Sequence, residues 1–263
     1  MSGVWPLMLR DLKKWYRNPV FFLTGLIQPL FWIALFGSAL SKLSDVPGVI
    51  PAGSTYITYI VGGVLTITAL FTGMFTGTNI IFDRRLGPMG RFLSSPIARS
   101  SIVFSRVFSA VLRILVQAVI LIVAALVLPN GLVIPKDFDL LDAGVIVAAI
   151  ILVSLMFSCL FSVIAIRMRE MNTIFGIVNL INLPLLFMSY AMFPADLMAG
   201  WIGDVAKYNP VSWSAEAMRT VILNGALTAS QWASVGRWLG GLALLTGLMV
   251  VITYFMAETE IRD

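Results

Sequence analysis

Residues able to carry out chemistry are scarce in this 263-residue sequence. It contains no histidine and one cysteine, Cys159, which lies inside an apolar run. Histidine acid–base chemistry, histidine-bound metal and histidine-ligated haem are therefore excluded. The sequence has no Gly-x4-Gly-Lys-Ser/Thr loop for nucleotide phosphates, and no pair of acidic residues lies within an apolar run. We therefore expect no catalytic residue, no bound metal and no cofactor on this chain.

Arginines recur at a spacing of seven in and before one apolar run. Arg99, Arg106 and Arg113 share a helical face, and Gln117 lies near them on that face. In a helix, Arg113 lies roughly 10 Å beyond Arg106 along the axis. A lipid-facing arginine at the centre of a membrane helix costs about 2.5–3.5 kcal/mol on insertion scales. These side chains are expected either to pair with a neighbouring helix or to form a cytoplasmic gate.

A second polar group, Asn172, Asn179 and Asn182, occupies one sector of another apolar run. Asparagine side chains can form hydrogen bonds between membrane helices. They can equally line a passage for an amphipathic substrate. The sequence leaves both interpretations open.

Residues 83–99 form a short basic connection that contains the apolar pair Phe92 and Leu93. This composition fits a short helix presented to a protein partner. It fits equally well a positively charged loop that only orients the neighbouring spans.

The connection 194–235 is more apolar than an ordinary outer loop. Asn209 can cap a helix whose first residue is Pro210, and Glu216 and Arg219 are three residues apart, so they can form an ion pair. One or two short helices that dip into the outer leaflet are expected here. The alternative is a loop packed over the bundle.

Membrane helices must position all of these residues. The chain is 59% hydrophobic and 12% charged, whereas a soluble domain has about 25% charged residues, so lipid replaces water over most of its surface. Six apolar runs are each long enough to cross a hydrocarbon core of about 30 Å. They cover residues 20–40, 56–82, 106–128, 143–166, 171–193 and 236–257. The expected fold is an all-α integral membrane protein with six transmembrane helices, and Gly73 and Gly77 permit close packing of the second.

The flanks of these runs predict orientation and domain limits. Apolar residues recur at helical spacing over 4–16 between basic ones, which indicates an amphipathic interfacial helix ended by Asn18-Pro19, or else a plain basic flank. Lys and Arg gather before the first run, after the second and after the fourth, which predicts that both termini are cytoplasmic.

One domain, 1–263, is expected: a cytoplasmic interfacial helix (1–19), a six-span bundle (20–257) and a cytoplasmic tail (258–263). The net charge of +5 does not indicate a nucleic-acid partner, because the basic residues lie beside apolar runs.

Four stretches of the sequence point together to a known family. They are Arg17-Asn18-Pro19 with Gln28-Pro29-Leu30-Phe31-Trp32 and Leu35-Phe36-Gly37; residues 83–99, which end in Pro-x-x-Arg; Pro184-Leu185-Leu186-Phe187-Met188-Ser189 with Phe193-Pro194; and Tyr208-Asn209-Pro210 with Glu216, Arg219 and Asn224-Gly225. In this order they resemble a permease of the daunorubicin-resistance type, in the type-2 branch of the ATP-binding-cassette (ABC) exporters.

The resemblance implies that residues 83–99 are a coupling helix that docks into a separate ATP-hydrolysing subunit. It assigns that coupling to Asp83, Arg84, Arg85, Gly87, Arg91, Phe92, Leu93 and Pro96. It also implies two permease protomers, identical or homologous, and two ABC ATPase subunits, with ATP and Mg on the ATPase. Arg85 and Gly90 stand where the family usually has acidic residues, so a more basic contact surface is expected.

The sequence therefore predicts the permease subunit of an exporter in a prokaryotic cytoplasmic membrane. An amphipathic drug, lipid or glycolipid is the expected substrate, and export of a polysaccharide or glycoconjugate is the alternative within the same superfamily. Outside it, the alternatives are a membrane scaffold or assembly protein and an intramembrane enzyme, for which a convergent catalytic set is missing.

Overall fold

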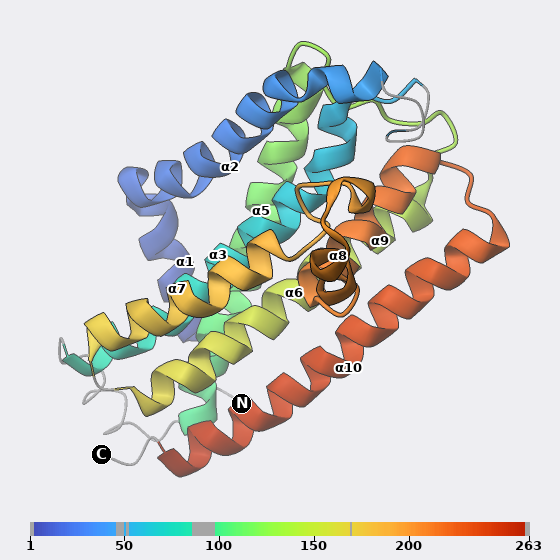
Figure 1. Cartoon of the computed structure of the whole chain (residues 1–263). Coiled ribbons are helices and arrows are strands. Elements are labelled where there is room, and N and C mark those ends of the chain that lie inside the picture. Colours follow the sequence, from blue (N-terminus) through green and yellow to red (C-terminus); the bar gives the residue numbers. More distant parts are fainter. Residues whose placement is uncertain (1–2, 46–49, 51–52, 86–97, 169, 261–263) are drawn as a thin grey trace.

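The computed structural model describes residues 3–45, 50, 53–85, 98–168 and 170–260. Within these ranges the chain is helical and contains no strand (Figure 1). The membrane-length and shorter helices are α1 (Val4–Arg17), α2 (Pro19–Ala39), α3 (Tyr56–Arg85), α5 (Arg99–Val127), α6 (Leu140–Arg167), α7 (Met171–Phe187), α8 (Gly200–Ala206), α9 (Pro210–Asn224) and α10 (Ala229–Glu260), with short 3-10 turns at Ser41–Asp45 and Ala195–Leu197. The expectation of an all-helical protein is confirmed for this part of the chain.

Helix α3 is the centre of the bundle. It contacts α2, α5, α6, α7 and α9, and 89% of its most apolar stretch is buried, against 17% for α10 on the outside. The predicted close packing at Gly73 and Gly77 is present, against α6. A Cβ atom at Gly73 would lie 2.8 Å from the backbone nitrogen of Ser158, and one at Gly77 would lie 2.4 Å from the carbonyl oxygen of Phe161. Only glycine permits these backbones to approach so closely.

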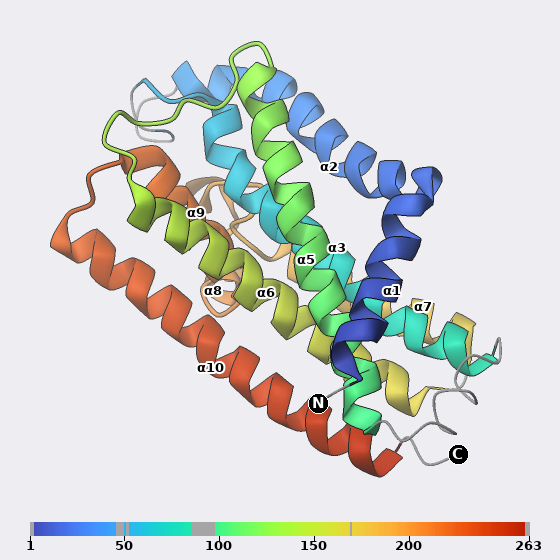
Figure 2. The same ribbon diagram turned by 180° about the vertical axis from the view of Figure 1, so that it is seen from behind.

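The ends of several helices meet at one end of the bundle. The backbone N–H of Ser100, at the start of α5, donates to Glu258 near the end of α10 over 3.1 Å. Arg167, which ends α6, lies 3.9 Å from the carboxylate of Glu260. Figures 1 and 2 show the start of α1 and the end of α10 toward this same end. The arrangement agrees with the predicted clustering of basic segments on one side of the membrane.

The predicted break at Asn18-Pro19 separates α1 from α2. The Asn18 side chain accepts a hydrogen bond from the N–H of Phe21 over 3.1 Å, and Pro19 occupies the first turn of α2. Figures 1 and 2 show α1 turning sharply away from α2 at this point. Helix α1 packs against α5 and α2, with Met8 and Trp15 buried and Trp5 exposed.

Five helices in the described ranges are long and apolar enough to cross a membrane: α2, α3, α5, α6 and α10. The fifth predicted span, 171–193, corresponds to α7, which ends at Phe187 and has 17 residues. A helix of this length rises roughly 25 Å, short of a core of about 30 Å. The carbonyls left unpaired at its end are satisfied from outside the helix, since Asn209 donates to the carbonyls of Leu185 and Met188. The count of six spans stays a prediction.

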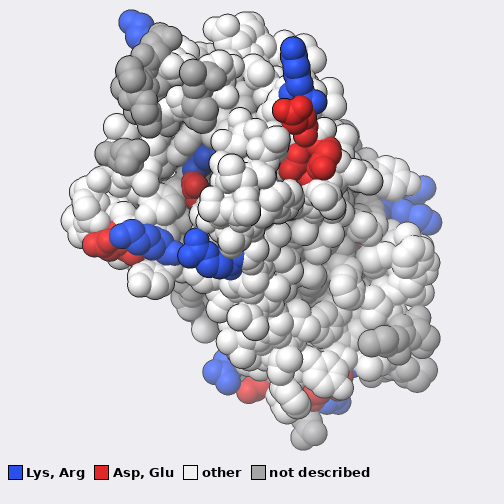
Figure 3. Space-filling model, turned by 90° about the vertical axis from the view of Figure 1, so that its right-hand side faces the viewer, with Lys and Arg blue, Asp and Glu red and all other residues white. Residues whose placement is uncertain are grey.

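The apolar connection 194–235 contains two helices, α8 and α9, as predicted, and α10 already begins within it at Ala229. Their entry into the outer leaflet stays a prediction. Helix α9 packs against α3, α6 and α10, and most of its residues are buried. On the face shown in Figure 3, charged side chains gather at the margins and in small patches, and most of the visible surface carries none. Such a surface is what a lipid environment requires.

Candidate functional site

Two glycines of α3 lie against residues 188–224, the turn after α7 together with α8 and α9, which we call the outer segment because the sequence predicts it to be on the outer side. A Cβ atom at Gly62 would lie 3.2 Å from the Cβ of Met218 on α9. At Gly63 it would lie 1.6 Å from the carbonyl oxygen of Ala191, in the turn that follows α7. The missing side chains let both segments pack directly on the α3 backbone.

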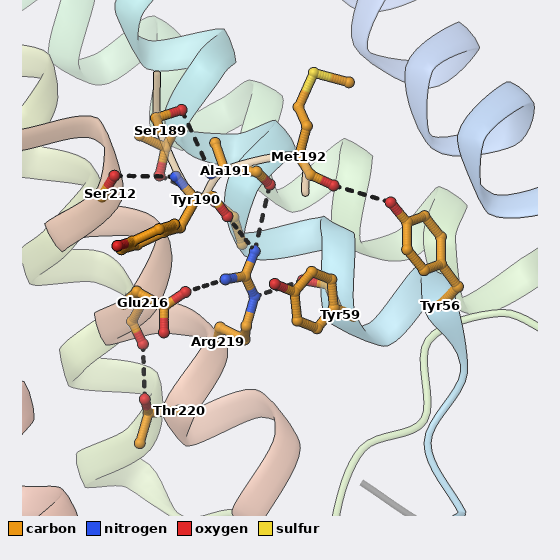
Figure 4. Close-up of polar contacts among 12 residues, drawn as sticks. Tyr56, Tyr59, Ser189, Tyr190, Ala191, Met192, Ser212, Glu216, Arg219 and Thr220 are labelled. Atoms are coloured by element: carbon orange, nitrogen blue, oxygen red, sulfur yellow. Dashed lines mark hydrogen bonds and ion pairs between the residues drawn. The ribbon is translucent and has the colours of Figure 1, made fainter. Parts of the chain in front are cut away.

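Arg219 of α9 joins the outer segment to α3 through the polar contacts shown in Figure 4. Its Nε donates to the carbonyl of Tyr59 over 3.1 Å, and its Nη2 donates to the carbonyl of Tyr190 over 2.7 Å. Its Nη1 pairs with Glu216, so the predicted ion pair is confirmed. The guanidinium also lies 3.7 Å from the ring centroid of Tyr59, within the range of a cation–π contact. Arg219 is 4% exposed, and this set of partners compensates its burial.

Asn209 fixes the start of α9 to the end of α7. Its Oδ1 accepts from the N–H of Val211 over 2.9 Å, and Pro210 follows at the first helical position, as predicted. Its Nδ2 donates to Leu185 and Met188 carbonyls at 2.9 and 2.7 Å. One asparagine thus caps the start of α9 and satisfies carbonyls at the end of α7, which holds the two helix termini side by side.

Nearer the opposite end, Arg106 of α5 pairs with Asp83 of α3. Their side chains are 6% and 15% exposed. This outcome matches the pairing interpretation of Arg106. It also places Asp83, which the resemblance assigned to ATPase contact, against a neighbouring helix; its coupling role stays a prediction.

Arg113, the next arginine along α5, has a different environment. It is 7% exposed, and within the described ranges its one hydrogen bond runs from Nε to the carbonyl of Ser109 over 3.2 Å. One turn further, Gln117 accepts from the Thr72 hydroxyl and donates to the carbonyl of Gly25, both over 3.3 Å. Gln117 therefore joins α5 to α2 and α3, whereas most of the Arg113 donors face open space.

That space consists of two cavities that share Arg113, Trp15 and Phe21 in their walls. The first, which we call the vestibule, has a volume of about 190 Å³ and is lined by charged residues of α1, α3 and α5. The second, which we call the apolar cavity, has a volume of about 170 Å³ and lies between α2, α3 and α5. Its walls are mainly aromatic and aliphatic, with threonines and Gln117 as sparse polar groups.

The remaining predicted residues are not brought together in one place. Asn182 is buried, and its Oδ1 has no hydrogen-bond partner among the described residues, whereas Asn172 and Asn179 are exposed on α7. Gly87, Arg91, Phe92, Leu93 and Pro96 lie outside the described residues, so the predicted coupling helix is not placed. Arg84 and Arg85 belong to the last turn of α3.

Several residues of these sites were not singled out from the sequence. Asp11 and Lys14 of α1 line the vestibule, and the Gly62-Gly63 pair and Tyr59 contact the outer segment. The glycine pair inside an apolar run was a detectable signal of close packing. Asp11 is the one acidic residue in the basic segment 4–17, a weaker signal. Across the described ranges, no three His, Cys, Asp or Glu residues are grouped to hold a metal ion.

Comparisons with known proteins identify relatives of this chain. A family model described as ABC-2 type transporter matches residues 3–223. The putative transport permease ycf38 of Porphyra purpurea is 27% identical over 83% of this chain and 73% of its own length. The probable doxorubicin resistance ABC transporter permease protein DrrC of Mycobacterium tuberculosis is 21% identical over 95% and 87%. The daunorubicin resistance ABC transporter permease protein DrrB1 of Streptomyces coeruleorubidus is 24% identical over 85% and 75%.

Proposed function

The chain belongs to the ABC-2 type transporter family, and from this premise we propose that it is the transmembrane subunit of an ATP-driven exporter. The observation that carries the proposal is the extent of the family match, which covers the described helices from α1 through α9. Energy comes from a separate ABC ATPase, which binds ATP and Mg. The coupling contact is the basic segment 83–99, between the end of α3 and the start of α5.

The substrate class of the proposal is an amphipathic molecule such as a drug, lipid or glycolipid. The apolar cavity supports it, because its wall combines aromatic side chains with a few polar groups. Two relatives are named for doxorubicin and daunorubicin resistance, which supports a drug-like cargo and does not set the charge of its headgroup.

We further propose a working unit of two permease protomers and two ATPases. Helix α7 supports a protein neighbour, since it exposes Asn172 and Asn179 together with Leu180 and Phe187. Exposed amides suit a second protomer or a polar passage better than lipid. In this arrangement α7 and the turn after it complete a sixth crossing, α1 lies in the cytoplasmic interface, and both termini face the cytoplasm of a prokaryotic inner membrane.

Purification of the tagged chain from its native membranes tests the exporter proposal. We expect a protein that carries a nucleotide phosphate loop to purify with the chain in mild detergent, in a ratio near one to one. Mass spectrometry identifies the partner. Recovery of the folded chain from those membranes without any ATPase contradicts the proposal and favours a scaffold role.

A further inference from the structure

We propose that the vestibule and the apolar cavity together form one binding site for an anionic amphipath, with its acidic headgroup at Arg113 and its apolar part between α2, α3 and α5. As a description of the exported substrate, this inference rests on the proposed function. As a statement about binding, it concerns the chain alone.

The vestibule carries an excess of positive charge. Its walls contain four cationic side chains, Arg10, Lys14, Arg106 and Arg113, and two carboxylates, Asp11 and Asp83, which leaves a net charge of +2. Asp83 pairs with Arg106, and Asp11 lies 2.8 Å from Arg10. Both carboxylates of the wall are therefore already engaged. Asp11 also interacts electrostatically with Arg113, but it is shared with Arg10 and Arg106, so the wall keeps its excess of positive charge.

Arg113 is the group that points to a ligand. Its side chain is more than nine-tenths buried and forms part of both cavity walls. A guanidinium has five N–H donors, and one of them is engaged here within the described ranges. Burial of a charge in this state is unfavourable. A carboxylate, phosphate or sulfate group placed in the vestibule would accept from the remaining donors and neutralise the charge.

The apolar cavity explains why the anion should carry an apolar part. It continues from Arg113 along α5 to Gln117, and its walls include Trp32, Phe71 and Phe75. Phe21 and Phe75 are 42% and 43% exposed, so the cavity opens to the surface at the rim between α2 and α3. An amphipath in the cytoplasmic leaflet can enter there sideways, with its headgroup held at the level of α1.

Native mass spectrometry of the purified full-length chain tests the site. The chain is incubated with equal amounts of dioleoyl-phosphatidylglycerol, which is anionic, and dioleoyl-phosphatidylcholine, which is zwitterionic. We expect the anionic lipid to be retained with roughly tenfold preference or more, because a charge-assisted hydrogen bond contributes that much to affinity. Arg113→Gln should abolish the preference, Arg113→Lys should keep part of it, and Arg237→Gln on the exposed face of α10 should leave it unchanged.

A cavity-filling variant and a soluble anion separate the remaining interpretations. Thr72→Phe narrows the apolar cavity without a change of charge, so it should reduce retention of the lipid severalfold. Inorganic phosphate at millimolar concentration should not displace the lipid. Equal retention of both lipids, an unchanged preference in Arg113→Gln, or complete displacement by phosphate would each overturn the proposal. Because no ATPase takes part, failure here leaves the exporter proposal standing, and absence of an ATPase partner leaves the lipid result standing.

Discussion

Arg219 and Arg113 are both buried arginines of the same helical bundle, with 4% and 7% of their surface exposed. Arg219 donates to the carbonyls of Tyr59 and Tyr190 and pairs with Glu216. Arg113 has one carbonyl partner in the described part of the chain and two cavities beside it. A buried arginine therefore has protein partners for its donors at one end of the bundle. Nearer the other end, a buried arginine lies beside a polar cavity.

The comparison contrasts a buried arginine whose partners are protein groups with one that lies beside cavities. The cost of burying the Arg219 charge is offset by groups of the protein itself, which join α9 to α3 and to the turn after α7. The cost at Arg113 is offset less completely, and such incomplete satisfaction is typical of sites that receive a ligand. We therefore expect mutations at the contact between α3 and the outer segment to affect folding most and mutations at the vestibule to affect binding most.

The largest expected effect comes from removal of the outer arginine. Arg219→Ala leaves Glu216 without its cation and two carbonyl groups without their donor, so we expect a loss of about 3–5 kcal/mol in unfolding free energy. Denaturant titration in detergent micelles measures it. The matched inner variant, Arg113→Gln, should lose less than about 1 kcal/mol, because it removes a charge with few partners. Equal losses at the two positions would contradict the comparison.

A smaller loss of unfolding free energy is expected at Gly63 of α3. Gly63→Ala adds a Cβ atom that would lie 1.6 Å from the Ala191 carbonyl oxygen, and relief of this overlap should cost about 1–3 kcal/mol. Gly247→Ala on α10 is the control, since nothing lies within 4 Å of its added Cβ. It should be neutral or stabilise by up to about 1 kcal/mol through helix propensity. Equal unfolding free energies for the two variants would show that the outer segment does not pack directly on α3.

Local signals in the sequence were sufficient for the helix boundaries that depend on capping. Asn18-Pro19 and Asn209-Pro210 begin helices as predicted, because a side-chain acceptor and a proline act within a few residues. Gly73 and Gly77 correctly indicated close packing, although the partner, α6, could not be derived from them. These features are local, so their outcome does not depend on the rest of the fold.

Features that depend on tertiary contacts were beyond the sequence. Apolar composition continues from α7 through residue 193, but Asn209 takes the carbonyls at which the helix ends. Helical spacing placed Asn172, Asn179 and Asn182 in one sector, whereas the neighbours of α7 bury only Asn182. In the same way, the sequence did not identify Asp83 of α3 as the partner of Arg106, and the predicted role of Asp83 in coupling stays a prediction.

The exporter assignment is tested most directly by ATP hydrolysis in the purified complex of this chain with its ATPase. The decisive variant combines Arg84→Glu, Arg85→Glu and Arg91→Glu. The control combines Lys136→Glu, Lys207→Glu and Arg237→Glu at exposed cations outside that segment. We expect the wild-type chain and the control to change the ATPase rate relative to the isolated ATPase. The decisive variant should still insert in the membrane but leave the ATPase at its isolated rate. A wild-type rate of ATP hydrolysis in that variant would contradict the claim that segment 83–99 couples the permease to the ATPase.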